Sequence, residues 1–192
     1  MIKDNFNAGY LRKILEVFDQ AESDDARKTG AVMVIFLETD EGPGLLFTKR
    51  AARLNQHAGQ ISFPGGAVEK TDGNYLNAAL RETEEEIGIK ADELEVIGRL
   101  PRQAVLDQWM IYPFAALWKS PRPIKADPVE VDRVIICSLQ ELTRQHHQEC
   151  WLPPDPAEAC RYILDGGEIL WGATARIIGR LLDKLIDQGS IA

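Results

Sequence analysis

The sequence predicts an α/β sandwich, a sheet covered by helices, with residues 1–192 forming one domain. A run of apolar residues at 31–37, rich in β-branched side chains, is typical of a buried strand. Apolar positions at helical spacing over 74–87 and 177–185 indicate amphipathic helices. The 192 residues suffice for a full core, and the mixing of strands and helices along them suits this fold class.

In the N-terminal half, the first predicted element is a helix over residues 8–22, whose apolar side chains share one face. These side chains are Leu11, Ile14, Leu15 and Phe18. Residues 38–44 contain Asp, Gly and Pro, which predicts a turn between the strand at 31–37 and a returning strand at 45–49. A short strand at 60–63 leads into a glycine pair. A helix over 74–87 follows and ends at Gly88, which supplies a left-handed cap.

In the C-terminal half, apolar runs predict strands at 94–100, 110–118 and 131–136, and residues 139–148 are predicted to form a helix. Proline-containing segments around 121–128 and 153–156 are predicted loops. The chain ends in an amphipathic helix over about 171–187, because its apolar residues repeat at helical spacing. They are Ile177, Ile178, Leu181, Leu182 and Leu185.

Charge and composition exclude several classes of partner. The net charge is −8 and no basic run occurs, which argues against binding to nucleic acid or to anionic membranes. No apolar stretch reaches the roughly 18 residues that a membrane-spanning helix needs. The first residues lack the apolar segment of a signal peptide. A cytoplasmic location is therefore expected.

The cysteines support the same location. There are three, Cys137, Cys150 and Cys160, an odd number without a C-x-x-C pair, so they are expected to be reduced thiols. His146, His147 and Cys150 are close in sequence, but no fourth ligand lies near them, so a zinc site is not expected there.

The most informative feature is a cluster of acidic residues in the helix at 74–87. With about 100° per residue, Glu82, Glu85 and Glu86 share an arc of about 100°. Each pair of like charges at these spacings destabilises a helix by about 0.2–0.5 kcal/mol. A divalent cation that prefers oxygen ligands would reverse the sign of this term. The pattern is consistent either with a solvated acidic face or with a metal site.

Residues 66–89 resemble the Nudix box, whose pattern is G-x5-E-x7-R-E-U-x-E-E-x-G-U, where U is a bulky aliphatic residue. The segment from Arg81 to Ile89 matches it, except that Thr83 replaces an aliphatic residue. Asp72 stands where the pattern has Glu, and the gap to Arg81 is one residue longer; Asp72 is therefore interpreted as a helix cap. The resemblance implies an α/β/α sandwich with a mixed β-sheet and a pyrophosphohydrolase activity.

Two further segments are similar to the coenzyme A pyrophosphatase branch of the Nudix family. Residues 45–66 follow its signature, with Asn55 at the position of its second arginine, and residues 171–177 follow its C-terminal W-G-x-T-A segment. The resemblance implies hydrolysis of CoA or an acyl-CoA to 4′-phosphopantetheine, or its acyl form, and 3′,5′-ADP. Because of Asn55, ADP-ribose or another dinucleotide is the alternative substrate, and a non-catalytic binding module is a third interpretation.

The resemblance also implies roles for individual residues. The carbonyl of Gly66 and the carboxylates of Glu82, Glu85 and Glu86 would hold Mg²⁺ or Mn²⁺, and Arg81 would position a carboxylate. Bound divalent ions lower the pKa of water and neutralise developing charge, and a carboxylate then removes the water proton. Glu85, Glu86 or Glu130, which precedes the strand at 131–136, are the candidate bases.

Cationic and aromatic residues complete the candidate site. Lys49, Arg50 and Arg53 flank the second strand and would bind substrate phosphates. His57 is interpreted as a structural residue of a loop rather than a base. Four aromatic residues, Trp109, Tyr112, Trp118 and Trp171, are expected mainly in the core. Trp109 lies at a junction of loop and strand, and stacking on a base is the alternative role for it. The expected partner is a small nucleotide; homodimers occur in the family, and the sequence leaves a homodimer open.

Overall fold

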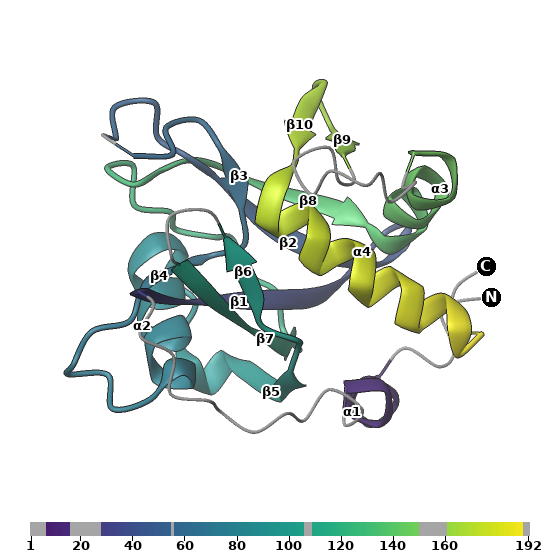
Figure 1. The fold of residues 1–192 in the computed structure, drawn as a ribbon, viewed down its shortest axis with the longest axis horizontal. Coiled ribbons are helices and arrows are strands. Elements are labelled where there is room, and N and C mark those ends of the chain that lie inside the picture. The colour runs from purple at the N-terminus through teal and green to yellow at the C-terminus, as the bar shows by residue number, and fades with distance from the viewer. Residues whose placement is uncertain (1–6, 16–27, 55, 106–108, 150–160, 190–192) are drawn as a thin grey trace.

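The computed structural model describes residues 7–15, 28–54, 56–105, 109–149 and 161–189. Its fold is mixed α/β, with a mixed β-sheet and flanking helices, as the sequence predicts (Figure 1). The elements are α1 (Ala8–Leu15), β1 (Lys28–Thr39), β2 (Gly42–Arg50), β3 (Ile61–Ser62), β4 (Gly65–Ala67), α2 (Tyr75–Ile87), a 3-10 turn (Ala91–Glu93), β5 (Leu94–Arg99), β6 (Gln103–Val105), β7 (Trp109–Trp118), β8 (Val131–Ser138), α3 (Leu139–Glu149), β9 (Tyr162–Leu164), β10 (Glu168–Leu170) and α4 (Gly172–Asp187).

The main sheet has eight strands with the central order β3-β2-β1-β7-β5. Strand β1 pairs parallel to β7 and antiparallel to β2, so the sheet is mixed. One edge of β1 is shared: residues 35–39 pair with β2, whereas residues 30–32 pair with β4. Strands β2 and β4 therefore pair with different segments of the same edge of β1. The two strands separate beside residues 33–34, in the middle of β1.

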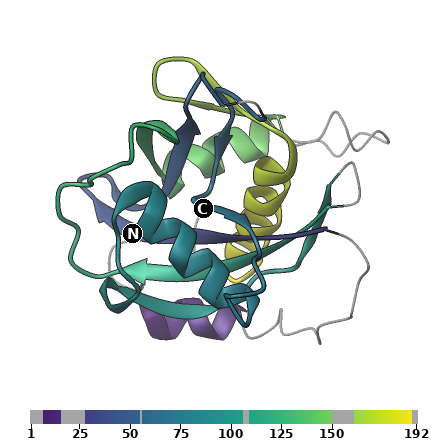
Figure 2. The same ribbon diagram turned by 90° about the vertical axis from the view of Figure 1, so that its left-hand side faces the viewer.

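Strand β1 is buried on both faces, which explains its continuous apolar sequence. Ala31, Met33 and Ile35 pack in one cluster with residues of α2, whereas Val34 and Phe36 pack in another that includes α1, α3 and α4. Side chains alternate between the two faces of a strand, so helices on both faces require apolar residues at every position. Figure 2 shows α2 and α4 on opposite sides of the sheet. The predicted strand at 31–37 is confirmed and extends to residues 28–39.

Several local predictions need correction. The turn predicted over 38–44 is shorter, because β1 and β2 continue to Thr39 and from Gly42. Strand β6 and the β9–β10 hairpin were not predicted, since each strand has only three residues. Trp171 is 52% exposed and does not belong to the core, unlike Tyr112 and Trp118.

Other predictions concern residues beyond the described ranges. These are the second half of the helix predicted at 8–22, the thiols of Cys150 and Cys160, the loop at 153–156, and Asn55. Cys137 is buried on β8, and burial raises the pKa of its thiol to about 12. Within the described residues, none of the helices has the length and apolar character needed to cross a membrane.

Candidate functional site

Helix α2 carries most of the candidate residues and is capped at both ends. The Asn74 side chain accepts a hydrogen bond from the backbone N–H of Asn77 at 2.8 Å, so Asn74 is the N-cap. Gly88 ends the helix with φ of 70°, a left-handed conformation that favours glycine, and its N–H donates to the carbonyl of Glu84 at 2.9 Å. The interpretation of Asp72 as the cap is therefore wrong, whereas that of Gly88 is confirmed.

Asp72 is instead the partner of Arg81. It is nearly buried, accepts the backbone N–H of Glu69 at 2.7 Å, and receives Arg81 Nε at 2.8 Å and Nη2 at 3.2 Å. The hydrogen bond from Arg81 holds the pKa of Asp72 below its usual range. Two parallel N–H···O bonds between guanidinium and carboxylate fix the geometry of both groups. Asp72 thereby anchors the Arg81 side chain.

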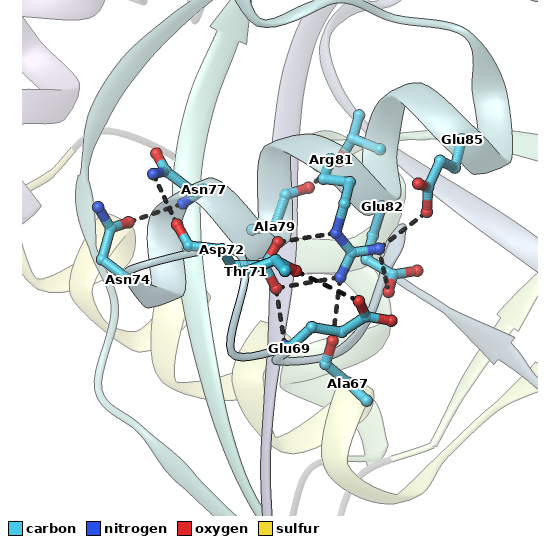
Figure 3. Close-up of polar contacts among 11 residues, drawn as sticks. Ala67, Glu69, Thr71, Asp72, Asn74, Asn77, Ala79, Arg81, Glu82 and Glu85 are labelled. Carbon is cyan, nitrogen blue, oxygen red and sulfur yellow. Dashed lines mark hydrogen bonds and ion pairs between the residues drawn. The ribbon is translucent and has the colours of Figure 1, made fainter.

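From this anchor, the guanidinium of Arg81 reaches two carboxylates of its own helix. Figure 3 shows Arg81 at the centre of a fan of contacts. Its Nη1 donates to Glu82 at 2.9 Å and to Glu85 at 2.8 Å, and its Nη2 donates to the carbonyl of Ala67 at 3.2 Å. Arg81 thus ties β4 to α2 and orients two acidic side chains.

Three carboxylates meet at the centre of the site: Glu82 and Glu86 from α2, and Glu130 from the turn before β8. Each offers an oxygen atom, and these atoms all lie within 4.8 Å of one another. Glu85 is not part of this group; its side chain is 55% exposed and contacts Arg81. The structure therefore brings Glu130 to the acidic face of α2, a convergence that the helical pattern alone does not predict.

The environment of Glu86 disfavours its charge. The side chain is 2% exposed, receives the Thr48 hydroxyl at 3.4 Å, and lies 3.5 Å from Arg50 Nη1. Burial raises the pKa of Glu86 to about 8 despite Arg50, and burial also raises the pKa of Glu82. Thr48 was not among the predicted site residues, although its hydroxyl stands within the otherwise apolar strand β2.

This burial predicts a pH-dependent stability of the metal-free protein. Folding raises the pKa of Glu86, so the folded protein is destabilised wherever Glu86 would be ionised in the unfolded chain. This destabilisation is absent at low pH and grows as pH rises from the ordinary glutamate pKa towards about 8. Without divalent metal, Glu86→Gln is expected to be more stable than wild type at pH 8 by about 2–4 kcal/mol, with no gain near pH 4.5. Urea unfolding of wild type, Glu86→Gln and the exposed control Glu84→Gln across this pH range measures the effect. An equal gain at pH 4.5 and pH 8 would contradict it.

Gly66 explains how close the backbone comes to these acids. A Cβ atom placed on Gly66 would lie 2.5 Å from the carboxylate of Glu82, far inside contact distance. Only glycine therefore lets the backbone of β4 pass beside this side chain. The glycine pair belongs to a short strand, β4, in which Gly66 pairs with Ala31 of β1.

The turn that carries Glu130 is fixed to the site by its backbone. Asp127 N–H donates to the carbonyl of Glu86 at 2.9 Å, and Ala51 N–H donates to the carbonyl of Glu130 at 2.8 Å. The carbonyl of Glu86 is one of the last four in α2, which lack partners within the helix. The turn thus gives the Glu86 carbonyl a partner and places Glu130 at the same time.

The three candidate phosphate ligands have different surroundings. Lys49 forms an ion pair with Glu168 of β10 at 2.6 Å. Arg53 donates to the carbonyls of Pro128 and Val129. Arg50 faces Glu86, and its Nε is buried with no hydrogen-bond partner among the described residues. Among the three, Arg50 is the one whose ion pair is with an acid of the cluster.

Two further candidates lie in ordinary structural contacts. His57 has φ of 56° and a ring nitrogen 2.9 Å from the Gln60 carboxamide oxygen. This local contact agrees with its interpretation as a structural residue of the loop. Trp109 is half-buried with the Lys28 ammonium 6.0 Å from its ring centroid.

Comparison with known proteins gives a consistent result. Residues 27–157 match the NUDIX domain model. The chain is 36% identical over 167 residues to the uncharacterized Nudix hydrolase NudL of Cronobacter sakazakii, covering 81% of each chain. It is 38% identical over 144 residues to NudL of Escherichia coli O1:K1, covering 72% of this chain and 73% of the relative. A Nudix hydrolase from M. smegmatis, RenU, has a similar fold, with a TM-score of 0.57 and 16% identity over 84% of this chain and 87% of that one.

Proposed function

The chain belongs to the Nudix family of pyrophosphohydrolases, and from this premise we propose that it hydrolyses the diphosphate bond of CoA or an acyl-CoA. The products are 4′-phosphopantetheine, or its acyl form, and 3′,5′-ADP. The similarity of residues 45–66 and 171–177 to the CoA pyrophosphatase branch supports this substrate. The chemistry itself, cleavage between two phosphates, is that of the family.

The observation that carries the proposal is the convergence of Glu82, Glu86 and Glu130. Nudix hydrolases typically act with a divalent metal, and hard carboxylate oxygens this close together fit Mg²⁺ or Mn²⁺. We propose that Glu82, Glu85, Glu86 and the Gly66 carbonyl hold the ion. An ion held by these residues would lower the pKa of water and would neutralise charge on the diphosphate. Glu85 contacts Arg81 in this structure, so its participation requires that its carboxylate exchange this partner for the ion.

Separate side chains are assigned to proton removal and to positioning of the acids. A carboxylate removes the proton from the attacking water, and Glu130 is the leading candidate, with Glu85 and Glu86 as alternatives. Glu130 is favoured because it approaches the two acids of α2 from a separate turn. Arg81 acts as a positioning residue: Asp72 anchors its guanidinium, which in turn orients Glu82 and Glu85.

Substrate phosphates are expected to bind Arg50. Its side chain is 26% exposed, and its guanidinium lies beside Glu86. A phosphate oxygen would bind the accessible part of this guanidinium with a charge-assisted hydrogen bond. Lys49 would contribute only by exchanging its ion pair with Glu168.

A substrate panel tests this proposal. CoA, acetyl-CoA, dephospho-CoA, ADP-ribose, NADH and diadenosine polyphosphates are incubated with the protein and either Mg²⁺ or Mn²⁺, and product formation is measured. CoA is expected to be hydrolysed faster than dephospho-CoA, because its 3′-phosphate adds a contact. Arg50→Ala is expected to lower kcat/KM for CoA by about 10–100-fold, and a smaller loss for dephospho-CoA would place the 3′-phosphate at Arg50.

The same panel decides between the substrate classes. Equal rates on CoA and dephospho-CoA, with ADP-ribose preferred to both, would favour the dinucleotide alternative that the departure at Asn55 keeps open. Nucleotide binding without turnover of any compound under either metal would instead favour the non-catalytic interpretation.

A further inference from the structure

Arg53 lies in the segment after β2 and contacts the turn that carries Glu130. Its Nε donates to the carbonyl of Val129 at 3.1 Å, and its Nη2 donates to the carbonyl of Pro128. These are the two residues directly before Glu130. A planar guanidinium with several N–H donors in a fixed fork can hold two neighbouring carbonyls at once.

The other hydrogen bonds that attach this turn to the rest of the protein lie on either side of Pro128 and Val129. Asp127 N–H is bonded to the carbonyl of Glu86, and the carbonyl of Glu130 is bonded to Ala51 N–H. Between these two points, the Val129 N–H bonds to the Asp127 side chain, within the turn itself. Among the described residues, Arg53 joins the middle of the turn, Pro128 and Val129, to the segment after β2.

We infer that Arg53 is a positioning residue that acts through Glu130, and that its guanidinium does not bind a substrate phosphate. The inference rests on the proposed function, in which Glu130 acts on the diphosphate. Arg53 donates to backbone carbonyls, whereas the Nε of Arg50 lacks a partner among the described residues. Displacement of a catalytic group by about 1 Å can lower the rate by about 100-fold. Loss of the two hydrogen bonds from Arg53, the clamp on this turn, is therefore expected to lower kcat.

A double-mutant cycle tests the inference. Arg53→Ala, Glu130→Gln and the combined variant are compared in kcat and KM on CoA, with Arg180→Ala, an exposed arginine of α4, as the control. Arg53→Ala is expected to lower kcat by roughly 10–100-fold with KM within about twofold of wild type. In the Glu130→Gln background the same substitution is expected to change kcat by less than about twofold, because its target is already lost.

A conservative variant separates positioning from general destabilisation. Arg53→Lys keeps a donor that can reach one carbonyl, so it is expected to recover part of the lost kcat. A higher KM in Arg53→Ala that persists in the Glu130→Gln background would show phosphate binding and overturn the inference. Additive losses in the cycle, no loss at all, or a kinetically silent Glu130→Gln would overturn it as well.

Amide hydrogen exchange of the turn tests the role of Arg53 without any measurement of turnover. The N–H groups of Val129, Glu130 and Val131 all donate to Asp127 within the turn. Arg53→Ala is expected to speed their exchange by about tenfold or more, and Arg180→Ala to leave it unchanged. If the wild type hydrolyses no compound of the panel, the proposed function fails, and the exchange result still decides whether Arg53 holds the turn. Unchanged exchange in Arg53→Ala would overturn the clamp.

Discussion

Replacement of Glu86 by glutamine is expected to lower kcat by several orders of magnitude while the fold is kept. Glu86 is the most deeply buried acid of the site and lies in contact with Thr48 and Arg50. Glutamine has nearly the same shape and still accepts the Thr48 hydroxyl, but it removes the negative charge that a divalent cation requires. The loss therefore reflects the missing charge rather than altered packing.

Three measurements define this result: kcat on CoA at saturating metal, Mn²⁺ affinity by calorimetry, and the unfolding transition. Mn²⁺ affinity is expected to fall together with kcat. Glu84→Gln is the matched control, because Glu84 is exposed on the same helix outside the cluster. Turnover of Glu86→Gln near that of wild type would show that the acidic face of α2 is not the metal site.

Replacement of Glu130 by glutamine is the second large effect, with kcat expected to fall by about 10²–10⁴-fold. A base must be deprotonated to act, so the wild-type rate decreases as pH falls below the pKa of that base. If Glu130 is the base, Glu130→Gln removes this acidic limb of the pH–rate profile and leaves the metal affinity nearly unchanged. If Glu130 is a metal ligand, high Mn²⁺ concentration restores part of the activity and the acidic limb remains.

Either result would confirm a role for Glu130, and the profile distinguishes the two. A Glu130→Gln protein with wild-type kcat, pH profile and metal dependence would exclude it. The base would then lie on α2, and Glu85 or Glu86 would be the better assignment.

The sequence predicted those parts of the fold that depend on local pattern. The run at 31–37 is continuous because both faces of β1 are covered, and Gly88 ends α2 because that position needs a left-handed conformation. Strand β4 was not predicted, because it has only three residues and two of them are glycines, which strands rarely contain. Only the pairing of Gly66 with Ala31, together with the nearby Glu82 carboxylate, shows why glycine is required.

The sequence predicted the site residues that lie together on one helix. It predicted less well the contacts between site residues from segments that are far apart in sequence. Helical spacing placed Glu82 and Glu86 on one face, and the structure confirms this proximity. Sequence suggested the same role for Lys49, Arg50 and Arg53, yet each has a different partner in the structure. Those partners, Glu168, Glu86 and the turn before Glu130, are set by packing between strands far apart in sequence, which spacing cannot reveal.

The hydrogen bond from Asp127 N–H to the Glu86 carbonyl also has a consequence for folding. It joins the end of α2 to a turn reached only after β5, β6 and β7 have been traversed. Closing so long a loop costs chain entropy, which must be recovered by the pairing of the intervening strands. The complete set of acids therefore assembles only when the sheet has formed. Recovery of Mn²⁺ affinity during refolding should follow completion of the sheet rather than formation of the α2 helix.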